Sequence, residues 1–130
     1  MSAENDLREA YREWRRLAQA EGEAIRAANW SLLSACQKAL SLLREQITSL
    51  LPKVQQEWTE AQVDKAARQE EINQIIRGLI EIARRNQILL RGLREAARAK
   101  LETLSETGKN LKQLRRSYGQ TSLSTWQSFS

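Results

Sequence analysis

The sequence predicts an all-α protein, either an elongated antiparallel helical hairpin or a three-helix, coiled-coil-like bundle, with a flexible C-terminal tail. Of its 130 residues, 41% are hydrophobic and 28% are charged, yet there are only five glycines and one proline. Strong helix formers, namely Ala, Leu, Arg, Glu and Gln, dominate the chain. Apolar residues recur at intervals of three and four, which places them on one stripe of a helix.

The first apolar stripe runs from Leu7 to Leu50 and predicts a helix over about 5–51. The segment 28–31 contains candidate N-cap residues, but the stripe keeps its spacing there, so we expect a continuous or merely bent helix. Pro52 is expected to end this helix, because proline lacks an amide proton and disfavours α geometry in the preceding residue.

Two further helices are predicted after the proline. A short one over 53–68 would lie at the bend of the hairpin, and a long one over 72–118 would carry a second apolar stripe. Within the long helix, Gly108 is the expected break. The sequence thus predicts a single helical domain over 1–119, followed by a tail over 120–130 that is polar, uncharged and disordered in isolation.

The few aromatic residues suggest where the core and the partner contacts lie. Tyr11 and Trp14 share the first stripe and are expected in the core, and Trp30 and Trp58 are expected to fill the ends of the hairpin rather than to bind a partner.

Two aromatic residues fall in the tail instead. Trp126 and Phe129 are candidate anchors for a partner protein, and the alternative is that they dock on the chain's own hairpin.

The composition argues against catalysis and metal binding. The chain has no histidine and one cysteine, so the commonest acid–base group and a thiolate metal cluster are both missing. Cys36 lies on the apolar stripe and is expected in the core, since no histidine can activate it. We predict no catalytic residue, metal or cofactor. With no secretory signal and no apolar run long enough to span a membrane, the sequence predicts a cytoplasmic protein without membrane insertion.

Positive charge is concentrated near the C-terminus. Residues 84–119 contain ten basic and three acidic side chains, whereas the whole chain has a net charge of +5. This segment is either a solvated helix face or a patch for an acidic partner. Tyr118 is its single aromatic residue, so bases would find little to stack on, and we predict no nucleic-acid partner. A nucleic-acid-binding hairpin is kept only as a third alternative function.

An ordered series of segments covers most of the chain: Trp14–Leu17, Glu21–Trp30, a leucine-rich helix ending at Leu51–Pro52, Ile80–Glu81, Asn86–Leu90 and Asn110–Gly119. This series resembles the FlgN family of flagellar export chaperones. Members of that family are similar in length, mainly helical and cytoplasmic, and share the Asn followed by Leu-Leu and the terminal Tyr-Gly.

The resemblance implies a bacterial type III export chaperone. Such a chaperone binds the C-terminal helices of the hook-filament junction proteins (hook-associated proteins 1 and 3), prevents their premature assembly and delivers them to the export gate. The family's substrate site lies on the C-terminal helical region, which corresponds here to Leu93, Ala97, Leu101, Leu104, Leu111 and Leu114.

The resemblance also implies a second contact and leaves one segment unassigned. The terminal tyrosine implicated in docking to the export-gate protein FlhA corresponds to Tyr118. The tail with Trp126 and Phe129 is not prescribed by the family pattern. The alternative function is a structural or self-associating coiled-coil adaptor without a secretion role, in which a homodimer interface would occupy the stripe over 93–118.

Overall fold

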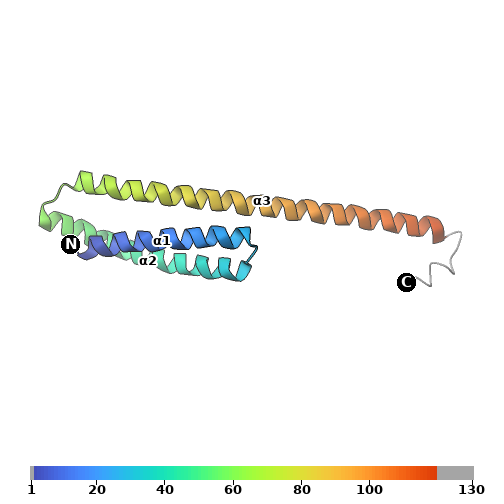
Figure 1. Cartoon of the computed structure of the whole chain (residues 1–130), viewed down its shortest axis with the longest axis horizontal. Helices are drawn as coiled ribbons and strands as arrows, with labels where there is room; N and C mark the ends of the chain where they lie inside the picture. Colours follow the sequence, from blue (N-terminus) through green and yellow to red (C-terminus); the bar gives the residue numbers. More distant parts are fainter. Residues whose placement is uncertain (1, 120–130) are drawn as a thin grey trace. The chain divides into compact units, whose positions relative to one another are not determined.

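The computed structural model describes the backbone of residues 2–119 and the side chains of residues 2–117, and that part of the chain contains three α-helices. Helix α1 spans Ser2–Arg26, α2 spans Trp30–Ala61 and α3 spans Lys65–Gly119 (Figure 1). No strand occurs among the described residues, and the predicted all-α class is confirmed. The tail over 120–130, expected to be disordered, lies outside the described residues.

Contacts between residues divide the chain into two units, Met1–Leu90 and Arg91–Ser130. The first unit contains α1, α2 and residues 65–90 of α3, and the second contains residues 91–119 of α3. The range expected to form a single domain, 1–119, is thus divided between these two units.

The continuous helix predicted over 5–51 is wrong, because the chain turns at Ala28 and Asn29. Ala28 adopts the left-handed region with φ 53°, which ends the first helix. Asn29 is the N-cap of α2, and its Oδ1 accepts a hydrogen bond from the Leu32 backbone N–H at 3.1 Å. The buried stripe also changes phase here, since Leu33 is 8% exposed and Leu32 is 42% exposed. Local capping therefore outweighs the regular spacing of the stripe.

The helix end predicted at Pro52 is also wrong, because Pro52 lies inside α2. A proline inside a helix removes one backbone hydrogen bond and costs about 3 kcal/mol. Val54 and Trp58, two and six residues further along the helix, are each only 1% exposed, so their burial offsets that cost. The helix ends instead where Gln62 adopts the left-handed region with φ 54°.

The short helix predicted over 53–68 is wrong, because residues 53–61 continue α2 and the second turn lies at residues 62–64. Helix α3 covers the whole range predicted for the long helix, 72–118, but begins earlier, at Lys65. Asp64 precedes α3, and its Oδ1 accepts a hydrogen bond from the Ala67 N–H at 3.2 Å, as a capping aspartate does. The break expected at Gly108 does not occur, because α3 continues through it. A single glycine destabilises a helix by only about 1 kcal/mol relative to alanine, and the helix formers on either side of it offset that cost.

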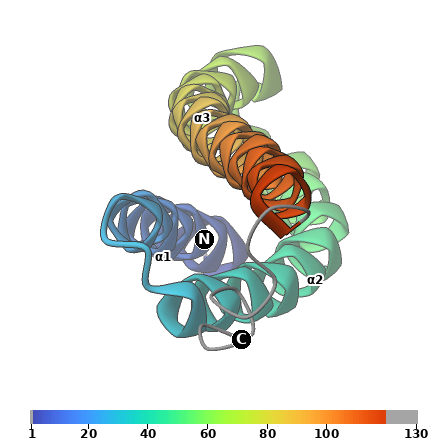
Figure 2. The same ribbon diagram turned by 90° about the vertical axis from the view of Figure 1, so that its right-hand side faces the viewer.

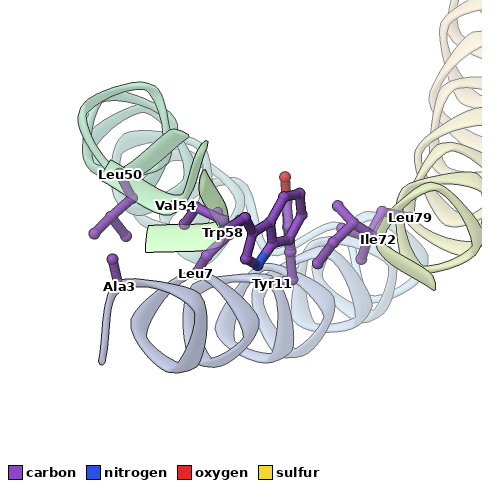
Figure 3. Packing of buried hydrophobic residues seen from close by; sticks show 8 residues of the cluster. All are labelled: Ala3, Leu7, Tyr11, Leu50, Val54, Trp58, Ile72 and Leu79. Carbon is purple, nitrogen blue, oxygen red and sulfur yellow. The ribbon is translucent and has the colours of Figure 1, made fainter. Parts of the chain in front are cut away.

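The main hydrophobic core of the first unit lies where all three of its helices meet. Figure 3 shows its eight buried residues, with Trp58 and Tyr11 among the largest. The cluster consists of Ala3, Leu7 and Tyr11 from α1, Leu50, Val54 and Trp58 from α2, and Ile72 and Leu79 from α3. The core position expected for Tyr11 is therefore confirmed.

Two smaller clusters continue along the α1–α2 hairpin, whose helices lie side by side in Figures 1 and 2. Cys36 is 4% exposed, as expected of a core residue, and Trp14 is partly buried against the first two clusters. Trp58, expected to fill an end of the hairpin, fills part of the main core next to the turn at residues 62–64. Trp30 does not, because it is the first residue of α2, immediately after the turn, and is 51% exposed.

A buried carboxylate ties the three helices together at one end of the first unit. Glu4 of α1 is 5% exposed, and its Oε1 accepts a hydrogen bond from Trp58 Nε1 of α2 at 2.9 Å. Arg68 of α3 donates from Nη1 to both carboxylate oxygens, at 3.0 and 2.9 Å. Burial alone would raise the pKa of Glu4, but the hydrogen bonds from Arg68 and Trp58 and the charges of Arg68 and Arg8 outweigh it, so the pKa lies below its usual value.

The same end of the unit has a second polar contact. The Glu57 carboxylate of α2 accepts hydrogen bonds from the backbone N–H groups of Ala3 and Glu4, at 2.7 and 3.2 Å. These are among the first N–H groups of α1, which have no partner inside their own helix. A carboxylate there also interacts favourably with the helix dipole.

A buried amide joins α3 to α1 further along. Asn86 is 5% exposed, and its Nδ2 donates to the Ala18 carbonyl at 2.8 Å and to Glu21 Oε1 at 3.1 Å. Gly22 makes this approach possible, because a Cβ at that position would lie 2.6 Å from Asn86 Oδ1. The lack of a side chain at Gly22 thus fixes where α3 meets α1.

The Glu4 contacts predict how stability depends on pH. Because the folded-state pKa of Glu4 lies below the usual value of 4.5, its contribution to the free energy of unfolding is present above that pH and is lost as the pH falls through the folded pKa. Urea denaturation followed by circular dichroism should show Glu4→Gln destabilised by about 1–3 kcal/mol at pH 7. The difference between the variant and the wild type should shrink below pH 4.5. A difference that does not change with pH would contradict an ionised Glu4.

The Asn86 contact predicts opposite effects for two glycine substitutions. Gly78→Ala should raise the free energy of unfolding by about 0.5–1 kcal/mol, since its Cβ would meet nothing within 4 Å. Gly22→Ala should lower it by about 1–2 kcal/mol, because Asn86 must give up its hydrogen bonds. In an Asn86→Ala background, Gly22→Ala should no longer destabilise. Equal effects of the two alanines in urea denaturation would refute this role for Gly22.

Candidate interaction surface

The first unit offers little that resembles a chemical site. Its buried carboxylate, Glu4, is fully engaged by Trp58 and Arg68. Within residues 2–117, no three His, Cys, Asp or Glu side chains come together as metal ligands would. None of the three described helices combines the length and hydropathy needed to cross a membrane.

One apolar hollow lies between the helices of the first unit. It has a volume of about 280 Å³ and is lined by Tyr11, Trp14, Arg44, Ile47, Thr48, Ile76, Leu79, Ile80 and Ala83. The Arg44 guanidinium lies over the Trp14 ring, 5.8 Å from its centroid. The sequence analysis missed this hollow. Ile76, Leu79 and Ile80 could have indicated it, because they supply more apolar residues than one narrow stripe of the helix requires.

The second unit presents a more extensive apolar surface. Every residue from 91 to 117 is exposed except Gly108, which is half-buried. The six residues predicted as the substrate site all lie in this segment of α3, and the structure leaves all six open to solvent. Their leucines are 40% to 67% exposed: Leu93, Leu101, Leu104, Leu111 and Leu114. We call the exposed face formed by these leucines and Ala97 the C-terminal stripe.

The other predicted contact residues are less well described. Tyr118 lies in α3, but its side chain is outside the described residues. Trp126 and Phe129 are outside them altogether. Their roles therefore remain predictions.

The C-terminal stripe continues a heptad repeat that begins in the first unit. Ile72, Leu79 and Asn86 are buried at intervals of seven, and the same register places Leu93 and Leu114 at equivalent positions, with Lys100 and Thr107 at the two positions between them. The second series of the repeat contains Ala97, Leu104 and Leu111. In heptad terms Leu93 and Leu114 occupy d positions, and Ala97, Leu104 and Leu111 occupy a positions. This register is typical of a helix that packs against another helix.

The two edges of the C-terminal stripe differ in chemistry. One edge, at positions e and b, contains five cations, which we call the cationic edge: Arg91, Arg94, Arg98, Lys112 and Arg115. The other, at positions g and c, is mostly small and uncharged, with Glu106 and Gln113 as the larger side chains at c. We call its small members the small-residue edge: Gly92, Ala96, Ala99, Thr103, Asn110 and Ser117. The sequence analysis located the positive segment but not this division, which appears once each charge is assigned a heptad position.

The net charge of the chain also resides in this segment. Residues 91–117 contain eight lysines and arginines and three glutamates, whereas residues 1–90 contain thirteen side chains of each sign. Within the described residues 91–117, no cation forms an ion pair with a carboxylate. The segment thus combines unpaired positive charge with exposed leucines.

No protein-family model matches this chain, and no curated protein or solved structure gives a significant match.

The exposure of the C-terminal stripe predicts a difference in hydrogen exchange between the units. Amides over 91–117 should exchange faster than those around Ile72 and Leu79, because the side chains of this segment are exposed and those of Ile72 and Leu79 are buried in the core. Exchange followed by mass spectrometry on the free protein checks this. Equal protection in the two segments would mean that the stripe is covered, as in a homodimer.

Proposed function

We propose that this protein is a helical export chaperone of the FlgN type that binds amphipathic helices of its substrate proteins on the C-terminal stripe. The observation that supports it is the exposure of five leucines on one face of a helix within a segment that buries none of its side chains. Exposed apolar faces of this kind mark interaction surfaces. An amphipathic helix binding along such a face is a recurring mode of recognition.

The identity of the substrates comes from the resemblance alone. On that basis, the bound segments are the C-terminal helices of hook-filament junction proteins, hook-associated proteins 1 and 3. The chaperone would hold them unassembled in the bacterial cytoplasm and deliver them to the export gate. Tyr118 would contact the FlhA-like gate protein, and Trp126 and Phe129 would be further anchors. The proposal includes no catalytic step and no cofactor.

The alternative, a self-associating coiled-coil adaptor, is favoured by one observation, the heptad register that extends from Ile72 to Leu114 and is interrupted only at Lys100 and Thr107 between Leu93 and Leu114. Sedimentation velocity of the free protein separates the two functions. A monomer leaves the C-terminal stripe available to a substrate. A stable dimer that Leu101→Lys dissociates would favour the adaptor.

The proposed function predicts which leucine substitutions weaken substrate binding. Leu101→Ser/Leu104→Ser should reduce the affinity for the C-terminal helices of the junction proteins by about tenfold or more, because two exposed apolar contacts are lost. The matched control is Leu42→Ser on α2, because Leu42 is 68% exposed and Leu101 and Leu104 are each 67% exposed. Leu42→Ser should leave the affinity unchanged. Titration calorimetry measures both affinities, and circular dichroism checks that the helices are retained.

Two results would count against the proposal. Failure of the wild-type protein to bind any junction-protein helix would refute the assigned substrates. An equal loss of affinity in the Leu42→Ser control would refute the assignment of the site to the C-terminal stripe.

A further inference from the structure

The two edges of the C-terminal stripe point to the chemistry of what binds there. We propose that the bound helix carries acidic residues along one edge only, the edge that faces the cationic edge of the stripe. This inference rests on the proposed function, since it assumes that a helix binds. It goes further by specifying the charge pattern of that helix and which of its edges faces the cationic edge.

The cationic edge is placed to contact a helix seated on the leucines. Arg94 and Arg115 occupy e positions, directly beside the a and d residues. Arg91, Arg98 and Lys112 occupy b positions, one step further around the helix. In helix pairs, e and g positions face the flanks of the partner and select it by charge. Arginine also binds a carboxylate through two parallel hydrogen bonds, which favours a fixed geometry.

These cations are available to a partner. Glu95 and Glu102 occupy f positions on the back of the helix, and Glu106 lies at c. Within the described residues 91–117, none of the three lies within ion-pair distance of an arginine or lysine. A carboxylate on a bound helix would therefore not compete with an existing ion pair.

The small-residue edge explains why one acidic edge is enough. Ala96, Thr103, Asn110 and Ser117 occupy the g positions opposite the cations. They have no charge to pair with, and their short side chains allow a second helix to approach closely. The partner's other edge is therefore expected to lack acidic residues, since a carboxylate there would lose water without gaining a counter-ion and Glu106, at c, would repel it.

A second copy of the chain does not provide the required acidic edge. In a parallel pair, e positions face g positions of the partner, so Arg94 and Arg115 would face small neutral residues. In an antiparallel pair, e positions face e positions, which brings arginines towards arginines or towards uncharged residues. Neither arrangement pairs the cations, and like charges across an interface disfavour the wrong partner. A different chain with one acidic edge satisfies them.

The proposal is tested with three synthetic amphipathic helices and the full-length protein. The peptides share the same apolar face and differ only along one edge, which contains Glu, Gln or Lys. The Glu peptide should bind about fivefold more tightly than the Gln peptide, and the Lys peptide should bind more weakly than both. The advantage of the Glu peptide should shrink as salt is raised. Equal affinity for all three would overturn the charge proposal, and the proposed function would stand. If neither these peptides nor the junction-protein helices bind, the proposed function itself is overturned.

A pair of charge-matched variants locates the effect. Arg94→Gln/Arg115→Gln should abolish the preference for the Glu peptide over the Gln peptide. Lys109→Gln/Arg116→Gln removes the same charge from f positions on the back of the helix and should preserve that preference. If both variants lose the preference equally, general attraction to a positive segment is the cause, and the proposed pairing of the acidic edge with the cationic edge is wrong.

Discussion

The buried carboxylate of Glu4 is the contact on which the arrangement of the first unit depends. It joins α1 to Trp58 of α2 and to Arg68 of α3, so that one side chain fixes three helices at their meeting point. A carboxylate that is 5% exposed is stable there only because its partners more than offset the loss of water. The surrounding core of Leu7, Trp58 and Ile72 then supplies the apolar burial.

A second polar contact sets the position of α3 along the hairpin. Asn86 occupies a heptad core position. An apolar residue there would pack without a directional contact, whereas the Asn86 amide must reach the Ala18 carbonyl and Glu21 to form its hydrogen bonds. Buried polar residues at such positions specify register at some loss of stability. Gly22 provides the space. Between the two polar contacts, α3 leaves the hollow beside Trp14 unfilled, which shows that it packs less completely than α1 and α2 do against each other.

The second unit exposes apolar residues of the kind that the first unit buries. Four of its five leucines occupy the a and d positions of the heptad register that begins in the first unit, and Leu101 lies beside them at e, yet all five are exposed in the free chain. Exposed leucines favour association of many kinds, so the edges must provide selectivity. The cationic edge and the small-residue edge do so differently, one by favouring acidic partners and the other by permitting close approach. The proposed chaperone function and the proposed acidic partner helix both depend on this asymmetric surface.

The sequence alone determined the helical class, the apolar stripes and the site of excess charge, because these follow from composition and spacing. It did not determine where the helices end. Capping by Asn29 introduces a turn inside the first predicted helix, and burial around Pro52 shifts the next turn to residues 62–64. Such effects depend on φ and ψ angles and on distant neighbours. Nor did spacing distinguish Leu79, which is 8% exposed, from Leu101, which is 67% exposed, although both lie on the same apolar pattern. Only the tertiary structure decides which part of a stripe finds a partner within the chain, because burial depends on what the other helices cover.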